Sequence, residues 1–233
     1  MIPLYDENKT KTKSYISFLI LIICSLVFFI QISTNTNAFI INYFGFKPKS
    51  LLSYETFNTF NTFNPFLSLI TSLFIHGGWI HLLGNMLYLW IFADNVEDEF
   101  GHQEFLIFYL SAGIFANLSQ FIFDIDSNIP VVGASGAIAG VLGAYLYLFP
   151  KAKIVVLLPF LIFFTIRVPA FALLIFWFFY QFINLSNQES NVAWLAHIGG
   201  FLFGLIYCII LKKKKREFVK GKSILLRKKG PWD

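Results

Sequence analysis

Long apolar runs separated by short polar segments make up most of the chain. A helix that spans a membrane needs about 20 predominantly apolar residues, because each residue adds only about 1.5 Å of length. Runs of suitable length and low charge occur at residues 14–32, 79–92, 105–123, 135–149, 168–182 and 192–211. The pattern therefore predicts an all-α membrane protein built as a bundle of six transmembrane helices.

Two further segments do not fit a spanning helix. Residues 33–75 are rich in Asn, Thr and aromatic residues and contain Pro48 and Pro65, so we expect a long loop at the membrane interface. Residues 154–166 are apolar but short and contain Pro159, which predicts an interfacial segment or a bent hairpin. A cleaved signal peptide is the alternative for the first run. That run is long for one and no small-residue cleavage site follows closely, so we expect a retained anchor.

Composition supports the membrane assignment. Hydrophobic residues make up 57% of the 233 residues and charged residues only 13%, about half the share of a soluble domain. Cys24 and Cys208 both lie inside apolar runs, which predicts small buried side chains rather than a disulfide. The net charge of +5 comes from basic residues beside the apolar runs, so topology accounts for it and no nucleic-acid partner is expected.

The positions of Lys and Arg predict the orientation. Six spans place both termini on one side, and a cytoplasmic assignment leaves only Lys47 and Lys49 outside. If residues 154–166 also spanned, the basic run 212–216 would lie outside, against the same rule. We therefore expect a multi-pass protein of the bacterial cell membrane with a cytoplasmic tail at 1–13, a membrane domain at 14–211 and a basic cytoplasmic tail at 212–233. The acidic segment 95–101 becomes a cytoplasmic loop, and the basic tail also favours contact with anionic membrane lipid.

Polar side chains cluster at one predicted depth. His81 and Asn85 are four residues apart and share a helix face near the outer end of the second run. Ser135 opens the fourth run at its outer end, and His197 lies about a turn and a half into the sixth. Ionisable residues inside a membrane are costly and mark functional sites. Three helices thus bring these residues to the same depth.

The motif Gly133-Ala134-Ser135-Gly136 places the serine at a loop-to-helix turn, where free backbone N–H groups are available to an oxyanion. Alone, the motif is weak, because a glycine-flanked serine in a membrane helix more often serves packing. Small residues, however, recur every fourth position on both runs, and such faces let two helices approach closely. They are Gly136, Gly140 and Ala144 on the fourth run and Ala196, Gly200 and Gly204 on the sixth. Docking them would bring His197 towards Ser135, as a nucleophile and its general base require.

The ordered motifs H-x-x-x-N at 81–85, G-A-S-G at 133–136 and A-H-I-G-G at 196–200 closely resemble the rhomboid proteases, as does V-E-D-x-x-G at 96–101. The resemblance covers about residues 14–211. It implies a six-helix bundle that hydrolyses peptide bonds of transmembrane protein substrates with a Ser–His dyad reached from the outer face. By that match Ser135 is the nucleophile and His197 the base. His81, Asn85 and the Ser135 N–H are oxyanion donors, and Gly133 helps to shape the oxyanion hole.

The sequence departs from the family at two points. Some members carry an aromatic residue four positions after the serine, where this chain has Ala139, and some have a Trp-Arg pair in the first loop, which is absent here. No Asp or Glu lies in any run at the outer depth, so we expect a dyad rather than a triad. His76 is either an interfacial loop residue or a contributor to the shape of the site.

Three other functions fit the sequence less well. A metal site formed by His76, His81 and His197 would lack a carboxylate or thiolate, and no H-E-x-x-H occurs, so neither a metal nor a cofactor is expected. A secondary transporter would need inverted repeats and charged or unwound mid-span segments, which are not evident. An inactive relative that only binds membrane proteins would typically have lost the serine or the histidine. This chain retains both.

Overall fold

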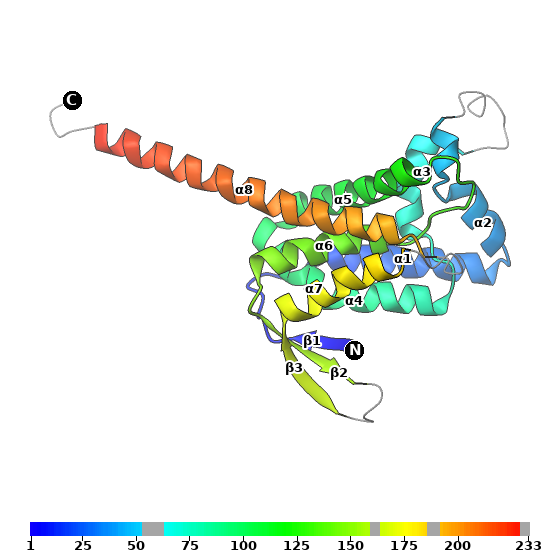
Figure 1. Ribbon diagram of the computed structural model, residues 1–233, viewed down its shortest axis with the longest axis horizontal. Helices are drawn as coiled ribbons and strands as arrows, with labels where there is room; N and C mark the ends of the chain where they lie inside the picture. The colour runs from blue at the N-terminus through cyan, green and yellow to red at the C-terminus, as the bar shows by residue number, and fades with distance from the viewer. Residues whose placement is uncertain (53–62, 159–163, 186–191, 229–233) are drawn as a thin grey trace.

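The structure is a computed structural model that describes residues 1–52, 63–158, 164–185 and 192–228, with side chains up to residue 211. In chain order the elements are β1 (Ile2–Asp6), α1 (Tyr15–Ser33), α2 (Asn37–Phe44), η1 (Pro48–Leu51), α3 (Pro65–Thr71), η3 (Ser72–Phe74), α4 (Trp79–Phe100), α5 (His102–Phe123), α6 (Ser135–Leu148), β2 (Lys153–Leu157), β3 (Thr165–Pro169), α7 (Ala170–Ile183) and α8 (Trp194–Lys228). Figure 1 shows α6 inside the helix bundle, with α2 and α3 at one end and α8 running out beyond the other.

Several helices have the length and apolar character of membrane spans. Helices α1, α5 and the first part of α8 (Trp194–Leu211) meet both criteria, and the bent pair of Pro65–Phe74 with α4 adds a fourth candidate. Helices α6 and α7 are also apolar but have only 14 residues each. The chain is therefore a multi-pass membrane protein with three or four full-length candidate spans in its described part. The predicted six transmembrane helices are reached only if α6 and α7 also cross the membrane.

The central helix α6 is enclosed by its neighbours, and every residue from Gly136 to Tyr145 is buried. A methyl group added at Gly200 would collide with the carbonyl oxygen of Gly136, and one at Gly204 would collide with that of Gly140. The backbones of α6 and α8 are thus in direct contact. This confirms the prediction that the small-residue faces of the fourth and sixth apolar runs dock on each other.

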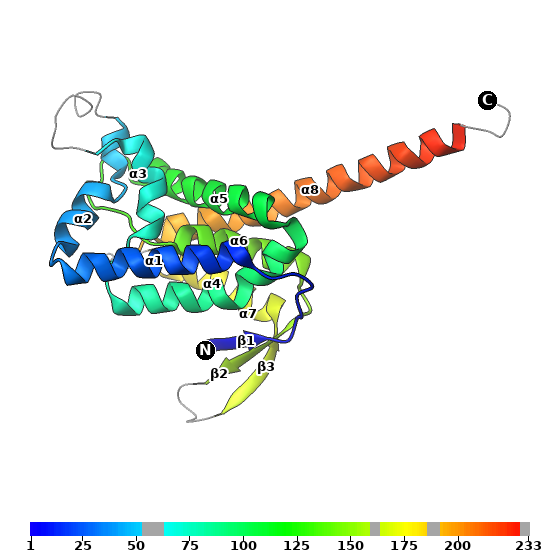
Figure 2. The ribbon, with the colours of Figure 1, turned by 180° about the vertical axis from the view of Figure 1, so that it is seen from behind.

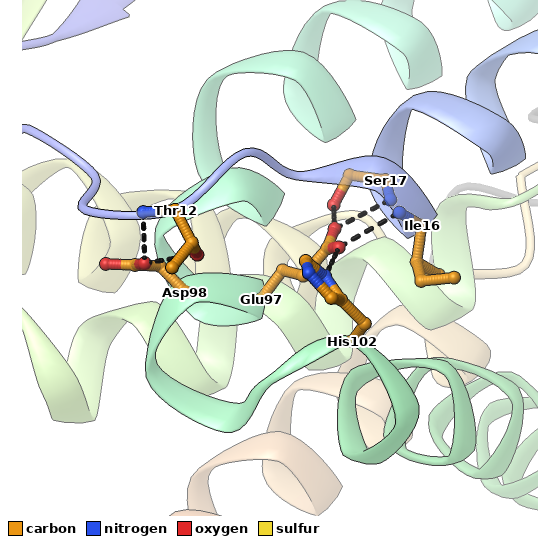
Figure 3. A network of polar contacts seen from close by, with 6 residues as sticks. All are labelled: Thr12, Ile16, Ser17, Glu97, Asp98 and His102. Carbon is orange, nitrogen blue, oxygen red and sulfur yellow. Dashed lines mark hydrogen bonds and ion pairs between the residues drawn. The ribbon is translucent and has the colours of Figure 1, made fainter.

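The segment at 95–101 differs from the predicted loop. It continues α4 to Phe100, and Glu97 is fully buried in it. Figure 3 shows the Glu97 carboxylate directed at the first turn of α1, where it accepts hydrogen bonds from the backbone N–H groups of Ile16 and Ser17. A carboxylate there satisfies N–H groups that have no partner within their own helix, which is why the acidic residue is buried rather than solvated.

A three-stranded antiparallel sheet in the order β1-β2-β3 stands at the side of the bundle next to α4 and α7 (Figures 1 and 2). Ile2 pairs with Leu157 and Lys153 with Pro169, so the N-terminal segment is joined to the connection between α6 and α7. The sheet corrects the expectation of an all-α chain. The segment 154–166 does turn back on itself, but as two strands, with residues 159–163 outside the described part.

Residues 33–75 contain more regular structure than the predicted loop. They form α2, η1, α3 and η3, while residues 53–62 lie outside the described part. Asn64 caps α3 by accepting from the N–H groups of Phe66 and Leu67, and Pro65 suits the first helical position. Pro48 and Pro65, which were expected to interrupt helices, therefore stand at the start of two short ones.

Candidate active site

Ser135 and His197 lie within hydrogen-bonding distance of each other. His197 Nε2 is 2.8 Å from Ser135 Oγ. Ser135 is the first residue of α6 and His197 lies in the first turn of α8, so both sit at the same end of the docked helix pair. The backbone contact between Gly136 and Gly200 brings the two helix starts close enough for the side chains to meet.

The backbone before Ser135 is held by surrounding segments. Val131 and Phe46 exchange backbone hydrogen bonds of 2.7 and 3.0 Å, and the Gly133 N–H donates to the Ser72 carbonyl at 2.9 Å. Gly133 has a φ of +118°, a conformation that a residue with a side chain rarely adopts. Asn117 of α5 binds the same region, because its Nδ2 donates to the hydroxyl of Ser72. Ser135 is thus presented from a fixed turn.

His197 is positioned by a residue that the sequence analysis did not identify. Its Nδ1 lies 2.9 Å from Oε1 of Gln181 in α7. The rings of Trp177 and Trp194 lie 5.8 and 6.0 Å from the His197 ring, measured between centroids. These aromatic neighbours come from α7 and α8 rather than from position 139, where Ala139 is fully buried. A single carboxamide within the apolar run 168–182 was the available signal.

His81, Asn85 and Gly133 border the space beside Ser135. An idealised Cβ on Gly133 would lie 2.5 Å from His81 Nε2 and 3.4 Å from Asn85 Nδ2, so both nitrogens face the Gly133 backbone. Asn85 Nδ2 is buried and has no partner among the described residues. The Gly77 N–H donates to His81 Nδ1 at 3.4 Å, which leaves Nε2 of a neutral ring to carry the proton. Two N–H donors therefore converge here.

His76 is fully buried beside His81, with 5.2 Å between the ring centroids. Neither ring nitrogen of His76 has a partner within the described part of the chain. Its backbone N–H and carbonyl both bond to the side chain of Gln31 in α1. His76 thus lies in the loop between η3 and α4, as one of the two alternatives predicted, but it is buried there next to His81.

This arrangement can support nucleophilic chemistry. A hydroxyl beside an imidazole nitrogen is the requirement for an activated serine, and nearby N–H donors suit the charge of a tetrahedral intermediate. Across the described residues, no group of three or more His, Cys, Asp and Glu side chains is placed to hold a metal ion.

Comparison with known proteins identifies the family. The family model described as Rhomboid domain matches residues 64–214, more than half of the chain. The chain is 30% identical over 175 residues to Rhomboid protein 1, mitochondrial, of Saccharomyces cerevisiae, covering 71% of this chain and 47% of that protein. It is 32% identical to the rhomboid protein YdcA of Bacillus subtilis, and the match covers 64% of this chain and 70% of YdcA. It is 39% identical to Rhomboid protease GluP of the same organism, and that match covers 49% of this chain and 20% of GluP.

The chain therefore belongs to the rhomboid family, as its motifs predicted. It spans about half the length of the yeast relative and a fifth of GluP.

Proposed function

We propose that this member of the rhomboid family is an intramembrane serine endopeptidase that cleaves transmembrane proteins with Ser135 as nucleophile and His197 as general base. The observation that carries the proposal is the 2.8 Å separation of His197 Nε2 and Ser135 Oγ. The family membership supports the same reaction, and GluP is by its name a rhomboid protease.

In the proposed reaction Ser135 Oγ attacks the carbonyl carbon of the scissile peptide bond while His197 Nε2 takes the hydroxyl proton. The negative charge that develops on the carbonyl oxygen is stabilised by His81 Nε2–H, Asn85 Nδ2–H and the Ser135 N–H. Collapse of the intermediate breaks the C–N bond, and His197 returns the proton to the leaving amine. A water molecule, deprotonated by His197, then attacks the acyl carbon. The bond between that carbon and Ser135 Oγ breaks, His197 returns the proton to Oγ, and the carboxyl product leaves. General-base catalysis of this kind contributes about 10²–10⁴-fold to the rate.

The proposed membrane arrangement has α1, α4, α5, α6, α7 and α8 as six spans. Both termini lie in the cytoplasm of a bacterial cell, and Ser135 lies near the outer face of the membrane. The distribution of Lys and Arg supports this orientation. Reporter fusions after Gly221 should be found in the cytoplasm and fusions near Asp126 outside. The opposite result would place the Ser135 end of the bundle at the cytoplasmic face.

The proposed substrates must unwind before they are cut. A peptide carbonyl inside a regular helix is hydrogen-bonded and shielded, so Ser135 can attack only an extended segment. An unpaired backbone group in lipid costs several kcal/mol, which restricts unwinding to places that water reaches or where the helix is weak. Helix-weakening residues such as Gly or Pro beyond the cleavage site should therefore favour cleavage, and replacing them by Leu should slow it.

A fluorophosphonate probe tests the proposed nucleophile. The probe should label the wild-type chain at Ser135, with loss of labelling in Ser135→Ala and strong slowing in His197→Ala. Ser119→Ala is a matched control, because Ser119 also lies near α8 but its hydroxyl donates to the Phe115 carbonyl in its own helix at 2.9 Å. Labelling of Ser135→Ala at the wild-type rate would contradict the proposal.

A further inference from the structure

Gln181 is a buried polar residue on a helix that is otherwise apolar. It lies in the last turn of α7, and only 2% of its surface is exposed. Its carboxamide makes two hydrogen bonds, one between Nε2 and the Trp177 carbonyl oxygen at 2.7 Å and one between Oε1 and His197 Nδ1 at 2.9 Å. Both ends of the amide are therefore engaged within protein.

These two contacts fix which way the amide points. The Trp177 carbonyl oxygen can only accept a hydrogen bond, so the NH₂ group of Gln181 must face it and the oxygen must face His197. If the amide were turned over, two oxygens would lie 2.7 Å apart without a proton between them. The backbone of α7 thus determines that His197 Nδ1 meets an acceptor.

An acceptor at Nδ1 in turn determines where His197 carries its proton. A neutral imidazole has one N–H and one acceptor nitrogen, and the partner of one nitrogen sets the role of the other. With Nδ1 protonated and donating to Gln181, Nε2 is free to accept the Ser135 hydroxyl proton at 2.8 Å. A proton on Nε2 instead would make His197 useless as a base.

We propose that Gln181 is a positioning residue for His197. Through the Trp177 carbonyl, it holds the imidazole in the tautomer with Nδ1 protonated and stabilises the imidazolium that forms when Ser135 is deprotonated. The expected effect of Gln181 on the cleavage rate rests on the proposed function, whereas its expected effect on the His197 tautomer does not.

A carboxamide suits this position better than a carboxylate would. Burying an ionised carboxylate costs several kcal/mol unless it is fully paired, whereas a neutral amide supplies the same directional acceptor without a charge. The rings of Trp177 and Trp194, whose centroids lie 5.8 and 6.0 Å from that of His197, give the imidazole a surrounding of low polarity. The hydrogen bond to Gln181 is correspondingly strong there.

The first test compares reaction rates in variants of the full-length chain. Gln181→Leu removes the acceptor and replaces the carboxamide by an apolar side chain of similar size. A neutral hydrogen bond of this kind corresponds to roughly a three- to tenfold loss of kcat, with KM nearly unchanged. Gln181→Glu keeps an oxygen towards Nδ1, and its acid form can also donate to the Trp177 carbonyl, so kcat should recover to within about threefold of wild type.

Asn184→Leu is the matched control. Asn184 Nδ2 donates to the Tyr180 carbonyl at 2.8 Å, the same side-chain-to-backbone bond that Gln181 makes to Trp177, three residues further along the chain. The hydrogen bond of Asn184 is exposed, and its acceptor is a backbone carbonyl four residues earlier rather than His197. We expect Asn184→Leu to leave kcat unchanged. If Gln181→Leu also left kcat unchanged, the proposal would be overturned.

The second test observes the tautomer directly. Nitrogen-15 NMR of the histidine side chains distinguishes protonated from unprotonated ring nitrogens, and with four histidines in the chain His197 can be assigned by comparison with His197→Ala. We expect Nδ1 of His197 to be protonated in the wild type and the two tautomers to be mixed in Gln181→Leu. An unchanged tautomer in Gln181→Leu would overturn the proposal even if the rate fell. If the wild-type chain cleaved nothing, the proposed function would fail while this measurement still decided the role of Gln181.

Discussion

Replacing Glu97 by alanine removes the acceptor that joins α4, α1 and α5. The Glu97 carboxylate lies 2.9 Å from the Ile16 N–H nitrogen, 2.8 Å from the Ser17 N–H nitrogen, 2.6 Å from the Ser17 hydroxyl and 2.6 Å from His102 Nδ1. Glu97 itself is fully buried. The truncation would leave the Ser17 N–H and hydroxyl without their partner inside the protein, whereas His102, whose side chain is 42% exposed, could bond to water instead.

The expected loss follows from the kind of contact removed. Leaving a buried donor without its acceptor costs about 1–3 kcal/mol, and loss of a helix N-cap costs about 0.5–2 kcal/mol. We take about 3 kcal/mol as the expected decrease in the free energy of unfolding. For a chain of this size that corresponds to a decrease of roughly 6–12 °C in Tm. Glu97→Gln should lie between wild type and Glu97→Ala, because one oxygen remains to accept.

Thermal unfolding in detergent, followed by circular dichroism, measures this difference. Glu99→Ala is the control, because it removes the same charge from the same helix at an exposed position two residues away. It should change Tm by little. At temperatures where Glu97→Ala is still folded, Ser135 should remain reactive, because the contacts of Glu97 lie at the other end of α4 from His81. If Glu97→Ala and Glu99→Ala unfolded at the same temperature, the inference that the buried carboxylate anchors α1 would be refuted.

Three further predictions concern the oxyanion donors, the helix contact and the N-terminal strand. Asn85→Ala should lower kcat about 10²–10³-fold with a smaller change in KM, because the buried Nδ2 lies beside Gly133 and has no acceptor among the residues that the structure describes. A normal kcat would show that Asn85 has only a structural role. Gly200→Ala should destabilise the fold by about 1–3 kcal/mol, because the added methyl group would collide with the Gly136 carbonyl. Gly84→Ala is the control and should be tolerated, because the space around its Cβ position is open. Equal Tm values for the two variants would contradict the close contact of α6 and α8. Burial raises the pKa of Asp6 from 3.8 to about 6 despite its hydrogen bond from Tyr145, so its contribution to stability is fully present below pH 3.8 and is lost as the pH rises through about 6. Tm of the wild type should accordingly decrease relative to Asp6→Asn across this interval, and parallel curves would show that the pKa of Asp6 is not raised in the folded protein.

The sequence predicts those features that depend on local pattern and backbone contact. The start of α6 at Ser135 follows from its glycines, and the docking of α6 on α8 follows from the four-residue spacing of Gly136, Gly140, Gly200 and Gly204. Small residues spaced in this way leave few other ways for two helices to meet. The proximity of Ser135 and His197 is a consequence of that docking.

Features that depend on long-range pairing could not be predicted in this way. Strand β1 pairs Ile2 with Leu157, and nothing in a five-residue segment that ends in Asp6 indicates a partner so far along the chain. The acidic residues around Glu97 predict a solvated loop, because the sequence does not show that the first turn of α1 faces them. The contact between Gln181 and His197 depends on how α7 is rotated about its axis, which the almost uniformly apolar sequence of α7 leaves undetermined.

The most direct test of the central claim is cleavage of a single-span reporter protein by the purified chain in lipid vesicles. Mass spectrometry of the products would locate the cut. The wild-type chain should hydrolyse one peptide bond near the end of the reporter helix. Ser135→Ala, His197→Ala and the double variant should all be inactive to the same extent, because paired catalytic residues act as a unit. Cleavage by Ser135→Ala at the wild-type rate and at the same bond would contradict the account.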